Sequence, residues 1–189
     1  FSKLLTQGMV LNHIYSRRTE KGGKDYFWPQ DVEHVFDDAG KVIGAKLIKA
    51  VESSGVTLPV GTAIDYEGVG TMSKSKNNGV DPQALIAKYG ADTARLFVMF
   101  ASPPEQTLEW NDAGVEGAHR FLRRVWAFAV KHQKPLRHGG ALPQDIGPAA
   151  RSLRREVHGV LKQVSHDYDR MQYNTVVSGC MKLLNALEA

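Results

Sequence analysis

Apolar residues follow a strand-like pattern early in the chain and a helical pattern later. Residues 1–11, FSKLLTQGMVL, predict a short helical turn leading into a buried strand, with Gln7 and Gly8 at the junction. Between Tyr15 and Tyr66 the runs shorten, and in EHVFDDAGKVIGAKL a turn at residues 38–40 separates two apolar runs. This arrangement indicates a β-hairpin. Residues 15–66 are therefore expected to form a small β-rich insertion.

Two short helices are predicted next. Asp81 can cap a helix and Pro82 suits its first position, so a helix should run to Tyr89 and stop at Gly90. A second helix, about residues 91–101, should be closed by the two prolines that follow.

The last third predicts three longer helices, each with an apolar stripe at spacings of three and four. The stripes are Val115, Ala118, Leu122, Val125 and Ala129; Ala149, Leu153, Val157, Val160, Leu161 and Val164 after Pro148; and Val176, Val177, Cys180, Met181, Leu184 and Leu187 after a cap at Asn174. A linker rich in glycine and basic residues, 135–143, separates the first two. Because each stripe needs a partner, a helical bundle is expected.

The segment 67–80, EGVGTMSKSKNNGV, has almost no apolar side chain to pin it, which predicts an exposed, mobile loop. Lys74 and Lys76 are separated by one serine, so two ammonium groups, hydroxyls and backbone N–H groups could surround a triphosphate. Neither a Walker-type P-loop nor a dinucleotide-binding glycine motif occurs. The residues alone leave two interpretations open, a phosphate-binding loop and a flexible linker.

Composition narrows the class of protein. With 189 residues, 42% of them apolar, the chain can bury a core in one domain or two small ones. No apolar run is long enough to cross a membrane and no signal-peptide order is present, so a cytoplasmic protein is expected. The single cysteine, Cys180, can form neither an internal disulfide nor a thiolate zinc site, and no zinc is expected. A start at Phe1 and an end in helical rhythm at Ala189 suggest a chain cut at both ends.

Charge is uneven along the chain. The net charge is +4, but residues 1–111 hold 12 Lys and Arg against 13 Asp and Glu, whereas residues 112–189 hold 12 against 7. One face of the second long helix is basic, and the first long helix adds further arginines. Such a surface can follow phosphates without reading bases, or can simply be a solvated face. The candidates for nucleic-acid contact are Arg120, Arg124, Arg151, Arg155 and Lys162.

The lysine segment resembles a family signature. Thr71-Met72-Ser73-Lys74-Ser75 is similar to the KMSKS loop of class I aminoacyl-tRNA synthetases, and the continuation KNNGVDP is similar to that of bacterial-type leucyl-tRNA synthetases. The flanks LLTQGMVL (4–11), KYGADTARLFVMFASPPEQTLEW (88–110) and GVEGAHRFLRRVW (114–126) resemble the same family in the same order. One departure stands out, because Thr71 replaces the first lysine of the signature.

The resemblance implies a mixed α/β and α fold. Residues 1–14 and 67–80 would be remnants of a Rossmann-like catalytic domain, with 15–66 as the leucyl-specific insertion. Residues 81–111 would be connecting helices, and 112–189 would begin the helical anticodon-binding domain.

The implied activity is leucine–tRNA ligation, in which leucine and MgATP form leucyl-adenylate and the leucyl group moves to tRNA-Leu. Lys74 would stabilise the departing pyrophosphate, and Met72, Ser73, Ser75 and Lys76 would contact ATP. The family's HIGH signature is missing, since His13-Ile14 continues as Tyr15-Ser16, and so is the editing insertion. The chain alone is expected to be inactive, and the full enzyme monomeric. Two alternatives remain: a non-catalytic RNA-binding helical module, and a valyl or isoleucyl relative.

Overall fold

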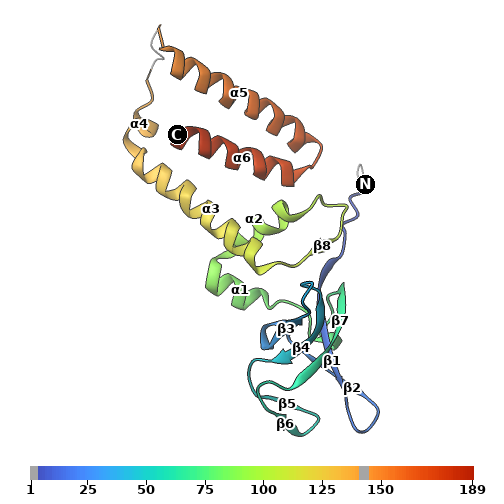
Figure 1. Ribbon diagram of the computed structural model, residues 1–189. Helices are drawn as coiled ribbons and strands as arrows, with labels where there is room; N and C mark the ends of the chain where they lie inside the picture. Colours follow the sequence, from blue (N-terminus) through green and yellow to red (C-terminus); the bar gives the residue numbers. More distant parts are fainter. Residues whose placement is uncertain (1–3, 141–144) are drawn as a thin grey trace. The chain divides into compact units, whose positions relative to one another are not determined.

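The computed structural model describes residues 4–140 and 145–189 (Figure 1). The chain separates into two compact units, Met9–Asp81 and a second that joins Phe1–Gly8 to Pro82–Ala189. Residues 1–3, which belong to the expected helical turn, lie outside the described residues. So do residues 141–144, the first three of which belong to the expected linker 135–143.

The first unit is built from β-strands. Five of them form a sheet in the order β2-β1-β7-β4-β3, and every neighbouring pair along this path is antiparallel. A separate hairpin pairs two short strands. The bounds of the sheet strands are β1 Val10–Arg18, β2 Lys24–Phe27, β3 Val32–Phe36, β4 Val42–Leu47 and β7 Ala63–Thr71, and those of the hairpin are β5 Val51–Ser53 and β6 Val56–Leu58.

The predicted β-hairpin is confirmed. β3 and β4 are joined by a turn in which the Asp37 carboxylate accepts from the backbone N–H of Ala39 at 3.0 Å and of Lys41 at 2.8 Å. The side chains of alternating strand residues form one core, made of Tyr15, Phe27, Val32, Ala45, Leu47, Leu58 and Ile64. The sheet extends past the predicted limits of the insertion, because β1 begins at Val10 and β7 ends at Thr71. The division of these residues between domains stays a prediction.

The predicted helical turn near the start is wrong for the residues that the structure describes, since residues 4–9 form no helix. The backbone at Gly8 is held by a tertiary contact instead. Its N–H donates to the Pro104 carbonyl at 2.8 Å, and a Cβ at Gly8 would lie only 1.9 Å from the Gln106 carbonyl oxygen. This close approach fixes a non-helical path that the local pattern did not reveal.

The second unit is helical, as the apolar stripes predict. Its elements are α1 Pro82–Tyr89, α2 Ala91–Ala101, β8 Leu108–Glu109, α3 Asp112–Lys131, α4 Gln133–His138, α5 Pro148–Asp169 and α6 Tyr173–Glu188. Pro82 is the first residue of α1, and the backbone turns at Gly90 with a φ of 84°, as expected. Two details were wrong. Part of the predicted linker is the short helix α4, and α6 begins one residue before Asn174, with Gln172 at the N-cap.

Helices of this unit pack pairwise, with α2 against α3 and α6, and α6 beside α5 (Figure 1). Phe97 of α2 is buried, and Val115 of α3 is fully buried. α5 and α6 approach closely at Gly179, where a Cβ would lie 2.3 Å from the Val164 side chain. The expected stripe on α3 is only partly internal, because Val125 and Ala129 are exposed and Phe121 is buried instead.

Candidate functional site

The lysine loop, residues 71–78, leaves the end of β7. Ser73 is extended, and Lys74–Lys76 form one 3-10 turn in which the Lys76 N–H donates to the Ser73 carbonyl at 3.3 Å. The side chains of Lys74 and Ser75 are exposed, while Met72, Ser73 and Lys76 are half-buried. The hydroxyls of Ser73 and Ser75 lie 3.2 Å apart. The turn thus presents one lysine and two hydroxyls to solvent from a short, closed segment.

The loop is closed by Asn78, whose side chain is completely buried. Its Oδ1 accepts from the backbone N–H of Ser73 at 2.8 Å. Its Nδ2 lies 3.3 to 3.4 Å from three backbone carbonyls at the ends of β1 and β7, those of Asn12, Gly70 and Thr71. In return, Asn12 Nδ2 donates to the Asn78 carbonyl at 3.1 Å. Both ends of the lysine turn are therefore tied to the same pair of strands.

Asn77 ties the loop at a second point. Its backbone is left-handed, with a φ of 49°, and its side-chain amide donates to the Tyr26 carbonyl of β2 at 2.8 Å. Asparagine tolerates this conformation better than most residues. Asn12, Asn77 and Asn78 anchor the loop through hydrogen bonds, so the pattern of apolar side chains does not reveal them. The signal available was two consecutive asparagines next to a glycine, since asparagine commonly hydrogen-bonds backbone groups in turns.

A carboxylate in the middle of β7 balances charge near the loop. Glu67 accepts from Lys24 in a short contact and from the Ser16 hydroxyl at 2.6 Å. The hydrogen bond from Lys24, then that from Ser16, and the charges of Lys24 and Lys76 hold the pKa of Glu67 below its usual value. Lys76 is thus close enough to Glu67 for their charges to interact, whereas Lys74 extends from the exposed side of the turn.

His13, which with Ile14 begins the HIGH pattern without completing it, lies in a cluster of rings on the sheet. His13 Nδ1 lies 3.0 Å from the Tyr66 hydroxyl, and the Tyr15 hydroxyl lies 2.6 Å from His34 Nε2. Burial, and then the negative charge of Tyr66, raise the pKa of Tyr15 to about 12. Burial, and then the charge of His13, lower the pKa of His34. These rings stabilise the strand unit.

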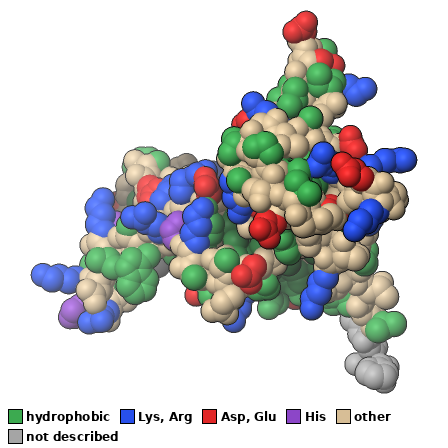
Figure 2. Space-filling view, turned by 90° about the horizontal axis from the view of Figure 1, so that it is seen from below, with side chains coloured by type: hydrophobic (Ala, Val, Ile, Leu, Met, Phe, Trp, Pro, Cys, Tyr) green, Lys and Arg blue, Asp and Glu red, His purple; other side chains and the backbone are tan. Residues whose placement is uncertain are grey.

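The five candidate nucleic-acid residues are all exposed, but they differ in their partners. Arg151 pairs with Asp145. Arg124 reaches from α3 to α6, where it donates to Asn185 at 2.8 Å and pairs with Glu188. Figure 2 shows how widely Lys and Arg side chains are spread over one face of the molecule, with acidic side chains between them.

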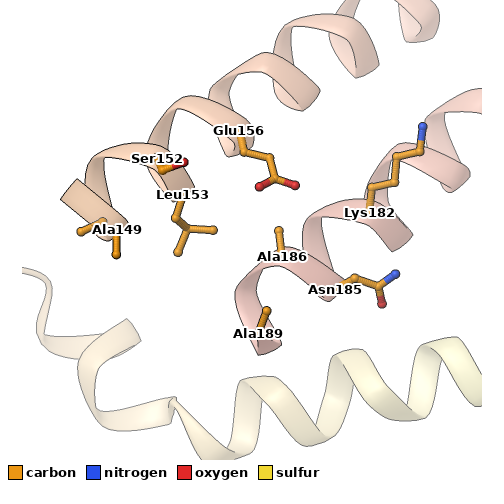
Figure 3. A pocket seen from close by; sticks show the side chains of 9 residues that line it. Ala149, Ser152, Leu153, Glu156, Lys182, Asn185, Ala186 and Ala189 are labelled. Atoms are coloured by element: carbon orange, nitrogen blue, oxygen red, sulfur yellow. The ribbon is translucent and has the colours of Figure 1, made fainter. Parts of the chain in front are cut away.

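A groove of about 670 Å³ opens between α5 and α6. Leu153 and Glu156 extend toward it from α5 and Ala186 from α6, with Lys182 and Asn185 at its edge (Figure 3). The lining is mixed, and no candidate residue from the sequence lies in it.

Within residues 4–140 and 145–189, three His, Cys, Asp or Glu side chains nowhere come together in a group that could hold a metal ion. Among the helices described, none has the length and apolar character needed to cross a membrane.

Known proteins resemble this chain over all or part of its length. The family described as tRNA synthetases class I (I, L, M and V) matches residues 48–111. Curated relatives named leucine–tRNA ligase cover the whole chain: that of Leptothrix cholodnii is 70% identical over 189 residues, and that of an Acidovorax species is 68% identical over 197. The chain spans only 20% and 22% of the length of these two proteins.

A solved structure is also similar. It is the LeuRS of Agrobacterium radiobacter in a ternary complex with tRNA and LeuAMS, with a TM-score of 0.53 and 25% sequence identity. The likeness covers 62% of this chain and 16% of that one. It supports a mixed arrangement of sheet and helices for this part of the sequence.

Proposed function

Because this chain is homologous from end to end to one segment of the leucine–tRNA ligases, among the class I tRNA synthetases, we propose that it acts as a part of such a ligase. The whole enzyme would activate leucine with MgATP to leucyl-adenylate and transfer the leucyl group to the 3′ end of tRNA-Leu. The observation that carries the proposal is the 68–70% identity over the full chain. The chain alone would be inactive, since it spans about a fifth of its relatives.

The lysine loop would serve the activation step. When the leucine carboxylate attacks the α-phosphate of ATP, the bond to pyrophosphate breaks and negative charge grows on the leaving group. A cation that meets this charge stabilises the transition state more than the bound substrate. Lys74 is exposed on a closed turn, and its side chain is free to reach outward. Met72, Ser73, Ser75 and Lys76 would complete the contacts to ATP.

Thr71, in the place of the signature's first lysine, is the last residue of β7 and pairs with Leu11 of β1. A lysine at this position would start from the rigid end of a strand, whereas Lys74 starts from the turn. We propose that the enzyme depends on Lys74 for the cationic contact to the leaving group.

The helical unit would meet tRNA through its charged surface. Arg120, Arg155 and Lys162 are exposed, as a phosphate-tracking surface requires, and Arg151 is exposed beside Asp145. We extend the proposal to a Rossmann-like catalytic domain that includes the ends of the sheet unit, and to a helical bundle that begins with α3. A monomeric cytoplasmic enzyme completes this proposal.

The test uses the full-length protein that contains this chain. We expect pyrophosphate exchange into ATP to depend on leucine and not on valine or isoleucine, and Lys74→Ala to lower its rate about 10²- to 10³-fold. The matched control is Lys46→Ala, which removes a surface lysine of β4 that pairs with Glu33 of β3. Exchange that depends on valine or isoleucine would assign the chain to one of those enzymes. If none of the three amino acids supports exchange, a non-catalytic RNA-binding module is favoured. An unchanged leucine-dependent rate in Lys74→Ala would reject the role of Lys74.

A further inference from the structure

The lysine turn is held by a pair of buried asparagines, Asn12 and Asn78. We infer that this pair positions Lys74 for the leaving pyrophosphate, so that it contributes to catalysis without touching ATP. The inference rests on the proposed function, because it assigns a role to residues that hold the same loop.

The hydrogen bonds of Asn78 connect three segments at one point. Its Oδ1 accepts from the N–H of Ser73, the residue that precedes the 3-10 turn, while Asn78 itself follows the turn. The side chain therefore spans the turn from one end to the other. Its Nδ2 is directed at carbonyls of β1 and β7, and Asn12 donates back to its carbonyl. The start and the end of the turn cannot move independently while these bonds hold.

Burial makes this arrangement demanding. Asn78 has no exposed surface and Asn12 is also buried, so a broken hydrogen bond there leaves a polar group without water. Aspartate has the shape of asparagine but lacks its amide donor. In Asn78→Asp, a carboxylate oxygen would face the carbonyls of Asn12, Gly70 and Thr71 at about the present distances of 3.3 to 3.4 Å. The turn would have to leave its place on the sheet.

Lys74 is the group that such a shift would affect. It is the first residue of the 3-10 turn and directly follows Ser73, whose N–H is held by Asn78. A displacement of about 1 Å is enough to cost a hundredfold in rate when a catalytic group depends on position. Asn77 differs, because its side chain hydrogen-bonds to the Tyr26 carbonyl. Loss of this bond would not break the hydrogen bond between Ser73 and Asn78.

The experiment compares single and double variants of the full-length ligase in leucine-dependent pyrophosphate exchange. We expect Asn78→Asp to lower kcat at least about tenfold while the KM for leucine changes less than about twofold. In a Lys74→Ala background the same substitution should lower kcat less than about twofold, because a residue that acts through Lys74 has nothing left to position. MgATP should also protect the loop of Asn78→Asp less well from trypsin at Lys74 and Lys76.

The matched control is Asn111→Asp. Asn111 caps α3 by accepting from the Gly114 N–H, and aspartate caps equally well, so exchange should be unchanged. If Asn78→Asp fails to fold, Asn12→Ala removes only the bonds made by the Asn12 side chain and should show the same dependence on Lys74 in weaker form.

Three results would overturn the inference: full activity in both asparagine variants, a loss of the same size with and without Lys74, or a rise in the KM for leucine without a fall in kcat. A different result would reject the proposed function itself, namely no leucine-dependent exchange in the unsubstituted full-length protein. The two failures are therefore distinguishable.

Discussion

The lysine loop and the basic surface of α5 both carry positive charge, but their charged side chains are positioned in different ways. The loop is held by hydrogen bonds of the buried Asn78, whose side chain contacts two strands. α5 runs for 22 residues, all of them described, and none of its side chains is buried. Charge in the loop is placed by tertiary hydrogen bonds, whereas charge on α5 is placed by the period of a helix.

This difference separates two kinds of recognition. A catalytic contact requires an atom at one place, which a rigid, internally bonded turn can supply. A phosphate-tracking surface requires only a suitable density of charge, because its free energy comes from released counterions and tolerates movement. The strand unit should therefore respond sharply to substitutions, and the helical surface gradually.

The largest expected effect lies in the core beneath the sheet. Leu47 is 1% exposed, and Leu47→Ala should destabilise the strand unit by about 2–5 kcal/mol. The same change at Leu153 of α5, which is half-buried beside an open groove, should cost less than half as much, since less contact is lost. Hydrogen–deuterium exchange of β1 and β7 amides in one variant, and of α5 amides in the other, measures both losses. Equal losses would contradict the comparison.

The next effect is specific to alkaline pH. The pKa of Tyr15 is raised to about 12 in the folded protein, against 10 when exposed. A raised pKa of this kind stabilises the fold fully below pH 10, and the contribution is lost as the pH rises from 10 to 12. Two pKa units correspond to at most about 3 kcal/mol.

Tyr15→Phe should remove this alkaline loss while weakening the fold slightly at neutral pH, because the hydrogen bond with His34 disappears. Urea unfolding of the strand unit between pH 7 and 11, followed by its circular dichroism, provides the measurement. An equally steep loss above pH 10 in Tyr15→Phe would point to another group.

Elements set by local pattern were predictable, and those set by tertiary contact were not. The hairpin of β3 and β4 and the long helices follow from turn residues and apolar spacing, which act within a few residues. The prediction for the segment before β1 was wrong because Gly8 is held by Pro104, almost a hundred positions away in the sequence. Likewise, Phe121 is buried on α3 while Val125 is exposed, a choice that depends on which positions neighbouring elements cover and that apolar spacing alone does not give.

The same distinction applies to the candidate site. The residues of the turn, Ser73 to Lys76, were identified from their chemistry and their resemblance to a family signature. Asn12 was not, since its role depends on a contact with Asn78, 66 residues later. A short polar side chain gives no periodic signal, so only the folded arrangement shows that it holds the loop.

A smaller effect is expected on the basic surface. Reversing the charge at Arg151, Arg155 and Lys162 in the full-length protein should weaken tRNA binding about tenfold at physiological salt and lower the salt slope by up to about 3. The control reverses a single charge at Lys41, which lies in the β3–β4 turn. Filter binding of tRNA at several salt concentrations measures both values. If the slope is unchanged, this face of α5 is only solvated.

The smallest effect concerns Arg124, which belongs to the predicted tRNA surface by sequence but contacts α6 in the structure. Its guanidinium meets Asn185 and Glu188, and about half of its side chain is exposed. An exposed ion pair of this type contributes about 0.2–1 kcal/mol, so Arg124→Ala and Glu188→Ala should show a coupling in that range in a double-mutant cycle of thermal unfolding. Because the guanidinium is engaged within the protein, Arg124→Ala should also change the salt slope of tRNA binding less than Arg155→Ala does. If the salt slope in Arg124→Ala falls by the amount of one full phosphate contact, this prediction is wrong. Arg124 would then contact tRNA as the exposed charges of α5 are expected to, in place of Glu188.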